Sequence, residues 1–65
     1  MTERDLPLTP GCVVLIAAFD DVPEHTFRVE EVFEDCVTGT ALTGPLAGEY
    51  GEPDIELILR VLSST

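Results

Sequence analysis

The residues of this 65-residue chain best suited to nucleophilic chemistry are two cysteines, Cys12 and Cys36, and one histidine, His25. A thiol becomes a strong nucleophile when a base such as imidazole lies beside it. The spacing of these three residues in the sequence does not indicate such a pair. We therefore expect His25 to be a solvent-exposed loop residue and both cysteines to be small apolar fillers. Two cysteines are too few for a disulfide framework, and bonding them would need neighbouring strands with closely placed Cα atoms.

Clusters of carboxylates are the best candidates for binding a cation. They fall in two short segments, with Asp20, Asp21 and Glu24 in the first and Glu49, Glu52 and Asp54 in the second. The chain has neither the paired ligand spacing of a zinc site nor the loop of an EF-hand. We predict no catalytic residue, no metal site and no cofactor. The alternative is a small metal- or thiol-dependent enzyme or metal-binding protein, using His25 with Cys12, Cys36 or the carboxylates of 20–24.

Further carboxylates are concentrated between residues 30 and 35, beginning with Glu30 and Glu31. A pair of carboxylates does acid and base chemistry only in a cleft that shifts their pKa values. The sequence shows no such cleft, and a chain this short is not expected to enclose a pocket of ~300 Å³. We interpret the run as a solvated strand face that keeps a small protein soluble.

The composition is strongly acidic, with 13 acidic residues, three basic ones and a net charge of −10. Binding to nucleic acid or to an anionic membrane needs a basic face, so the charge argues against both. No stretch approaches the ~18 apolar residues of a spanning helix, and no membrane insertion is expected. A field this negative speeds the capture of cationic protein surfaces. A protein partner with a basic surface is therefore predicted.

The elements that must position these residues are predicted to be short strands. Residues 12–19 are apolar without a break and rich in β-branched side chains, which is typical of a buried strand. A strand that is apolar on both faces is unusual in an antiparallel sheet, where one face normally meets water. If Val13 and Leu15 point inward, Val14 and Ile16 face outward and are candidates for contact with a partner or a second copy. The opposite orientation, with Val14 and Ile16 pointing inward, is an open alternative.

The second predicted strand covers residues 27–34. Phe27 and Val29 alternate with charged residues, but the alternation slips at Val32. A bulge at Glu30-Glu31 would return Val32 to the inner face.

The remaining elements are shorter. Residues 36–43 are rich in Thr and Val and predict a third strand, in which Gly39 marks a bend or a close backbone approach. A short fourth strand over 49–52 is restricted to an edge or a bulge by its glycine and the following proline. Residues 55–62 fit helical and strand spacing equally. We favour one tight helical turn near 55–58 and a strand near 59–62.

This layout resembles the SH3-like barrels, over roughly residues 8–62. The residues that carry the resemblance are Pro10-Gly11 before the first strand, the stretch Arg28 to Val32, and the closing stretch Asp54 to Val61. In that fold the closing stretch is often a single 3₁₀ turn that leads into the last strand. The resemblance implies an all-β fold of four to five short antiparallel strands. Related ferredoxin-docking subunits present a basic face, so their role is not carried over to this acidic chain. Recognition of proline-rich peptides is not expected either, because the chain has no Trp and one Tyr.

We predict a single domain over residues 1–65, with 1–7 as a flexible lead-in, in a cytoplasmic protein. Its expected role is that of a non-catalytic interaction module that binds a basic protein surface or forms a homodimer. A subunit of a larger enzyme complex, inactive alone, is a further alternative. The predicted partner-binding residues are Asp20, Asp21, Glu24, Glu30, Glu31, Glu49, Glu52, Val14 and Ile16.

Overall fold

The computed structural model describes residues 8–63, which form an all-β fold with one short 3₁₀ turn. This confirms the predicted fold class. The prediction of a flexible lead-in over 1–7 lies outside the described residues. In chain order the elements are β1 (Val13–Ile16), β2 (His25–Val32), β3 (Val37–Ala41), β4 (Tyr50–Gly51), η1 (Ile55–Leu57) and β5 (Ile58–Ser63).

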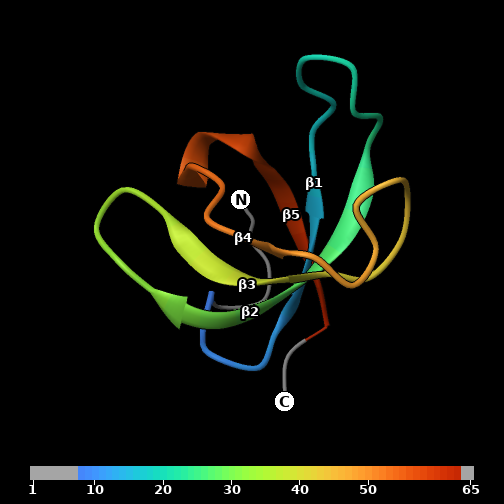
Figure 1. Cartoon of the computed structure of the whole chain (residues 1–65). Helices are drawn as coiled ribbons and strands as arrows, with labels where there is room; N and C mark the ends of the chain where they lie inside the picture. Colours follow the sequence, from blue (N-terminus) through green and yellow to red (C-terminus); the bar gives the residue numbers. More distant parts are fainter. Residues whose placement is uncertain (1–7, 64–65) are drawn as a thin grey trace.

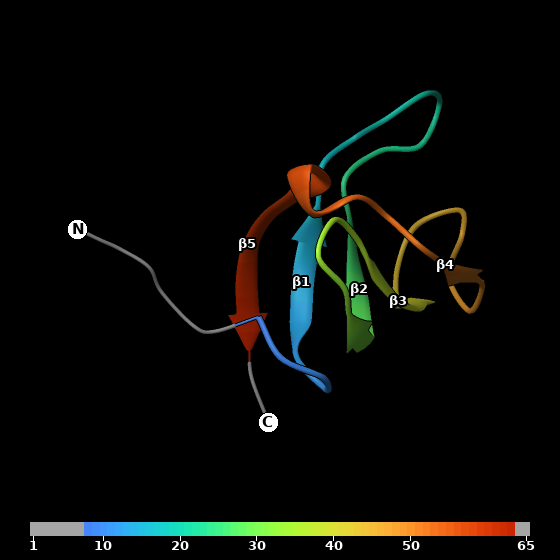
Figure 2. The same ribbon diagram turned by 90° about the vertical axis from the view of Figure 1, so that its left-hand side faces the viewer.

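The five strands make one antiparallel sheet with the spatial order β4-β3-β2-β1-β5. The sheet is strongly curved, and η1 leads directly into the start of β5 (Figures 1 and 2). The short strand β4 lies at one edge, as its sequence predicts, and β5 lies at the other. A hydrogen bond from the Ala17 amide to the Leu57 carbonyl, 2.7 Å long, ties the end of β1 to η1. The predicted order of one tight helical turn followed by a last strand is confirmed by η1 and β5.

The core is formed by side chains from the first three strands and the residue before β1. Its fully or almost fully buried apolar members are Cys12, Val14, Ile16, Phe27, Val29, Val37 and Ala41. Val14 and Ile16 are 0% exposed, so the outward orientation and the partner contact predicted for them are wrong. Val13 and Leu15 face the other way and are half-buried. The opposite parity, which the sequence left open, is the one that the strand adopts.

The predicted bulge in the second strand is present, because the pairing of β2 with β3 shifts register between Val29 and Glu31. It does not have the predicted consequence. Val32 is 37% exposed and lies at the end of β2, so it does not return to the core.

Gly39 lies where β3 comes closest to β2. A Cβ atom at this position would collide with the carbonyl oxygen of Arg28 and lie 3.0 Å from the ring of Phe27. Only glycine permits this approach, which confirms the close contact predicted from its place in the strand.

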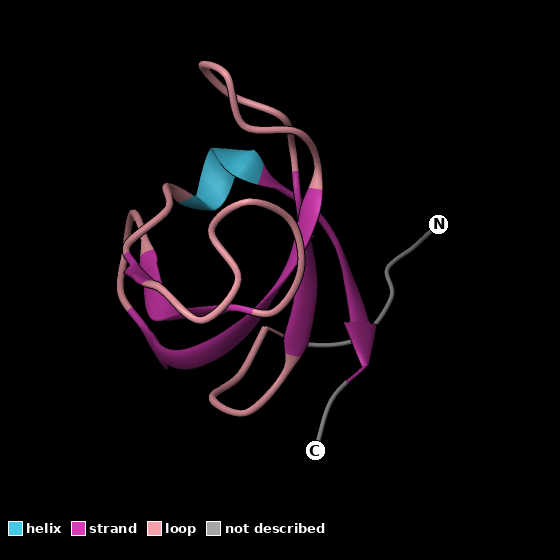
Figure 3. Ribbon diagram, turned by 45° about the vertical axis from the view of Figure 1, so that its right-hand side comes forward, coloured by secondary structure: helices cyan, strands magenta, loops and turns pink. Residues whose placement is uncertain are grey.

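Two loops extend the curved sheet. The first, between β1 and β2, is an arm closed by paired hydrogen bonds between Phe19 and Val22, and it holds Asp20, whose φ is 49°. The second joins β3 to β4 and turns at Gly44 and Gly48, both with positive φ. Figure 3 shows both loops, drawn in pink. No helix among residues 8–63 is long and apolar enough to cross a membrane.

His25 is the first residue of β2 and is only 5% exposed. The prediction of an exposed loop histidine is therefore wrong. Its acidic neighbours in sequence belong to the arm, whereas the imidazole itself packs inward against Phe19, with the two ring centroids 6.2 Å apart.

Candidate functional site

A pocket of about 310 Å³ opens where the inner side of the sheet meets the β3–β4 loop and η1. Its volume is close to the ~300 Å³ that a chain this short was not expected to enclose, and the pocket is partly open to solvent rather than enclosed. The curvature of the sheet supplies the concavity. The lining residues are Ile16, Phe19, His25, Phe27, Ala41, Leu46, Glu49, Tyr50, Gly51, Glu52, Pro53, Asp54 and Leu57.

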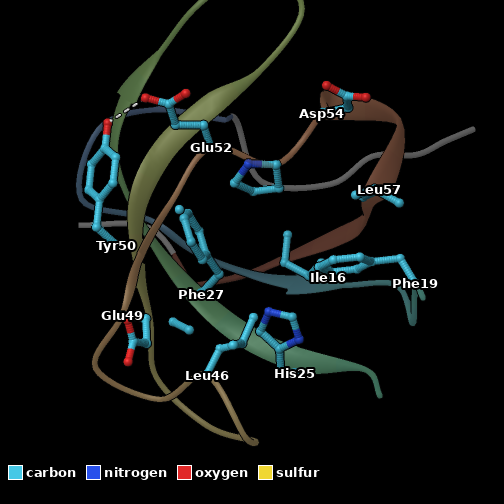
Figure 4. Close-up of a pocket in the computed structure, with 13 residues that line it drawn as sticks. Ile16, Phe19, His25, Phe27, Leu46, Glu49, Tyr50, Glu52, Asp54 and Leu57 are labelled. Atoms are coloured by element: carbon cyan, nitrogen blue, oxygen red, sulfur yellow. Dashed lines mark hydrogen bonds between the residues drawn. The ribbon is translucent and has the colours of Figure 1, made fainter. Parts of the chain in front are cut away.

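The inner surface of the pocket is apolar. Ile16, Phe27 and Ala41 are core residues with 0 to 3% of their surface exposed, and all three also line the pocket. Phe19 and Leu57 line the side formed by the arm and η1, and both are partly buried against the core (Figure 4). An apolar group that enters the pocket therefore meets hydrocarbon and aromatic rings rather than water.

Three exposed carboxylates, Glu49, Glu52 and Asp54, belong to the same pocket and form what we call its acidic rim. The Tyr50 hydroxyl donates a hydrogen bond of 3.0 Å to an oxygen of Glu52 (Figure 4). This hydrogen bond, with smaller contributions from partial desolvation and the Glu52 charge, raises the pKa of Tyr50 above its usual value. The phenol is therefore held in its protonated, donating form, and it fixes Glu52 at the rim.

His25 supplies the only imidazole of the pocket. Its Nδ1 lies 3.0 Å from the carbonyl oxygen of Pro23, which can only accept, so Nδ1 carries the ring proton. The Nε2 atom of the neutral ring is then an acceptor. In Figure 4 the ring points into the pocket between Leu46 and Ile16.

A second hollow, of about 410 Å³, continues from the acidic rim. It is lined by Glu34, Asp35, Asp54, Ile55 and Glu56, and Asp54 belongs to both hollows. The Ile55 amide donates a 3.0 Å hydrogen bond to the Asp35 carbonyl, which joins the β2–β3 turn to η1. We call the carboxylates of both hollows the acidic band; they are Glu34, Asp35, Glu49, Glu52, Asp54 and Glu56.

Cys36 lies next to this band and is a free thiol, as is the buried Cys12. Partial desolvation raises the pKa of Cys36, and the charges of Asp35, Glu52 and Asp54 raise it further. A raised pKa keeps the sulfur protonated and therefore weakly nucleophilic near neutral pH. Neither cysteine lines the pocket that contains His25.

The structure brings together only some of the predicted site residues. Glu49 and Glu52 lie on the acidic rim, with Asp54, which the sequence grouped with them as a possible cation ligand. The other predicted acidic residues are exposed but line neither hollow; they are Asp20, Asp21 and Glu24 in the arm and Glu30 and Glu31 on β2. Within residues 8–63, no group of three His, Cys, Asp or Glu side chains is placed to hold a metal ion.

Sequence reasoning missed the pocket itself and the residues that give it specific chemistry. Phe27 was expected in a strand but not as part of a binding surface, and His25 was expected in solvent. A signal was available for Tyr50, because a lone tyrosine between Glu49 and Glu52 is an aromatic residue placed among charges. The concavity had no signal, since it depends on how far the sheet curves.

Comparisons with known proteins give no relative for this chain. No protein family matches the sequence, no curated protein is similar to it, and no solved structure matches the fold.

Proposed function

We propose that this protein is a non-catalytic interaction module that holds a basic segment of a partner protein along the acidic band. The observation that carries the proposal is the apolar pocket bordered by Glu49, Glu52 and Asp54. An apolar surface supplies affinity through burial, and the surrounding charges select the sign of the partner. The SH3-like arrangement inferred from the sequence is consistent with such a module, although it does not by itself specify a function.

The distribution of basic residues supports the same orientation. Arg28 and Arg60 pair in register with Val13 and Leu15, which face away from the core. Cross-strand partners share one face of a sheet, so both arginines lie on the outer face, opposite the pocket. A cationic segment that approaches the acidic band therefore meets carboxylates without competition from these arginines.

The rival function, a thiol-dependent enzyme, is less well supported. Its nucleophile would be Cys36, and neighbouring carboxylates raise the pKa of that thiol rather than lower it. Activated cysteines lie in electropositive surroundings, which is the reverse of the arrangement around Cys36.

The proposal is tested by NMR with ¹⁵N-labelled protein and a short arginine-containing peptide, titrated at low and at moderate salt. We expect the amide signals of residues 49–54 to shift and the affinity to fall as salt rises, since the Debye length shrinks from ~30 Å at 0.01 M to ~10 Å at 0.1 M. Shifts confined to the arm or to β2, or no binding at low salt, would contradict the proposal.

A further inference from the structure

The Nε2 atom of His25, a residue that lines the pocket, has no hydrogen-bond partner among residues 8–63. His25 is 5% exposed, and its only hydrogen bond within residues 8–63 joins Nδ1 to the Pro23 carbonyl. A buried acceptor without a donor is unfavourable, so a ligand that brings a donor to this atom gains both a hydrogen bond and relief of that cost.

The surroundings of Nε2 decide what kind of donor can reach it. Ile16 and Phe27 bring apolar surface to the same pocket, and the Phe19 ring packs against the imidazole. A bare ammonium or guanidinium group pushed into this space would lose its hydration beside apolar side chains. Tyrosine and tryptophan carry an apolar ring with one donor, so they satisfy both the pocket and the acceptor.

Resting on the proposed function, we propose that the pocket takes a tyrosine or tryptophan side chain from the partner, whose O–H or N–H donates to His25 Nε2. Lysine or arginine residues on either side of this aromatic anchor pair with the acidic rim. The cavity of about 310 Å³ has room for a single large aromatic side chain. Charge complementarity with Glu49, Glu52 and Asp54 sets the sign of the flanking residues.

A second copy of this chain does not fit the description of the occupant. The sequence has no Trp, and its single tyrosine, Tyr50, is flanked by Glu49 and Glu52 rather than by basic residues. The occupant is therefore a different protein. In an extended segment, residues two positions apart project from the same face about 7 Å apart, which favours the pattern basic-x-aromatic-x-basic.

The test uses capped pentapeptides of the form Arg-Ser-X-Ser-Arg, where X is Tyr, Trp, Phe or Leu, with affinities measured by calorimetry. The Tyr and Phe peptides differ by one hydroxyl, so they isolate the hydrogen bond. We expect the Tyr and Trp peptides to bind roughly three- to tenfold more tightly than the Phe peptide. His25→Phe keeps a ring but removes the acceptor, so it should abolish the preference for the Tyr and Trp peptides over the Phe peptide.

A readout on the unmodified protein keeps the test decisive if His25→Phe does not fold. The chain has one histidine, so its Nε2 resonance is unambiguous in ¹⁵N NMR. The Tyr peptide should shift that resonance and the Phe peptide should not. Equal affinities for Tyr and Phe with no Nε2 shift would overturn the aromatic anchor yet leave the proposed function intact, provided both peptides bind and weaken in salt. Failure of every peptide to bind at low salt would overturn both.

Discussion

The chemistry of individual side chains in this protein is set by where the fold places them. Tyr50 and Cys36 both lie among carboxylates, and in both the pKa is raised, so each retains its proton. His25 is buried, its Nδ1 is hydrogen-bonded to the Pro23 carbonyl, and the residue lines the pocket. Sequence neighbours did not reveal this arrangement for His25, because the charged arm around residues 20–24 is typical of an exposed loop.

Tyr50 should ionise only above its usual pKa near 10, since the phenol donates to Glu52. The pKa of Tyr50 is higher in the folded protein than in the unfolded protein. The hydrogen bond to Glu52 therefore stabilises the fold fully at pH values below the unfolded pKa, and this stabilisation is lost as the pH rises through the folded pKa. Glu52→Gln should move the midpoint down toward the usual value. Absorbance near 295 nm reports this residue alone, because the chain has one Tyr and no Trp.

Glu49→Gln is the matched control for this titration, as it removes a rim carboxylate that does not bond to the phenol. It should leave the Tyr50 midpoint almost unchanged. An equal shift in both variants would mean that general charge, rather than the Tyr50 to Glu52 hydrogen bond, holds the proton.

Cys36 should react slowly with iodoacetamide near pH 8, more slowly than a free cysteine, because its thiol is held protonated. Asp35→Asn removes both a charge and a hydrogen bond that raise the pKa, so it should speed alkylation. Glu30→Gln, on β2, is the control and should have little effect. Wild-type alkylation faster than that of free cysteine would contradict the account and favour the thiol-enzyme alternative.

At the scale of elements, the sequence predicted strand positions better than strand orientation. The bulge near Glu30, the edge position of β4 and the turn before β5 each follow from a local irregularity in alternation or from glycine and proline. The parity of β1 had no such signal. Both of its faces are apolar, so a shift by one residue leaves the pattern unchanged, and only packing in three dimensions buries Ile16 rather than Leu15.

The orientation of β1 can be checked by truncating one residue on each face. Ile16→Ala should lower the free energy of unfolding by about 2–5 kcal/mol, because it leaves a cavity in the core. Leu15→Ala, on the half-buried face, should cost less than half as much. Denaturant unfolding measures both, and a larger loss for Leu15→Ala would reverse the assignment of the two faces.

Gly39 should tolerate no side chain. Gly39→Ala places a Cβ against the Arg28 carbonyl, so β2 and β3 must separate, at a cost of at least about 2–3 kcal/mol. Gly51→Ala is the control, because its Cβ would meet the Phe27 ring and Pro53 at ordinary contact distances. Thermal unfolding should show a large loss for the first variant and a small change for the second. Equal melting temperatures would show that the strands are not this close.

At the scale of the whole molecule, the acidic rim and the apolar pocket lie on the same part of the surface. The net charge of −10 predicted a basic partner from composition alone, but composition gave no location. Two acidic segments, 20–24 and 49–54, were equivalent as sequence. They differ in the fold, since only the second borders an apolar pocket, and that difference depends on sheet curvature and on the path of the β3–β4 loop.

The most direct measurement compares two triple variants with the same change in net charge. The rim variant carries Glu49→Gln, Glu52→Gln and Asp54→Asn, and the arm variant carries Asp20→Asn, Asp21→Asn and Glu24→Gln. Calorimetry with the peptide Arg-Ser-Tyr-Ser-Arg at low salt should show at least about a tenfold weaker affinity for the rim variant and less than about a threefold loss for the arm variant. Equal losses in the two variants would mean that net charge alone attracts the peptide and would contradict the central role of the pocket.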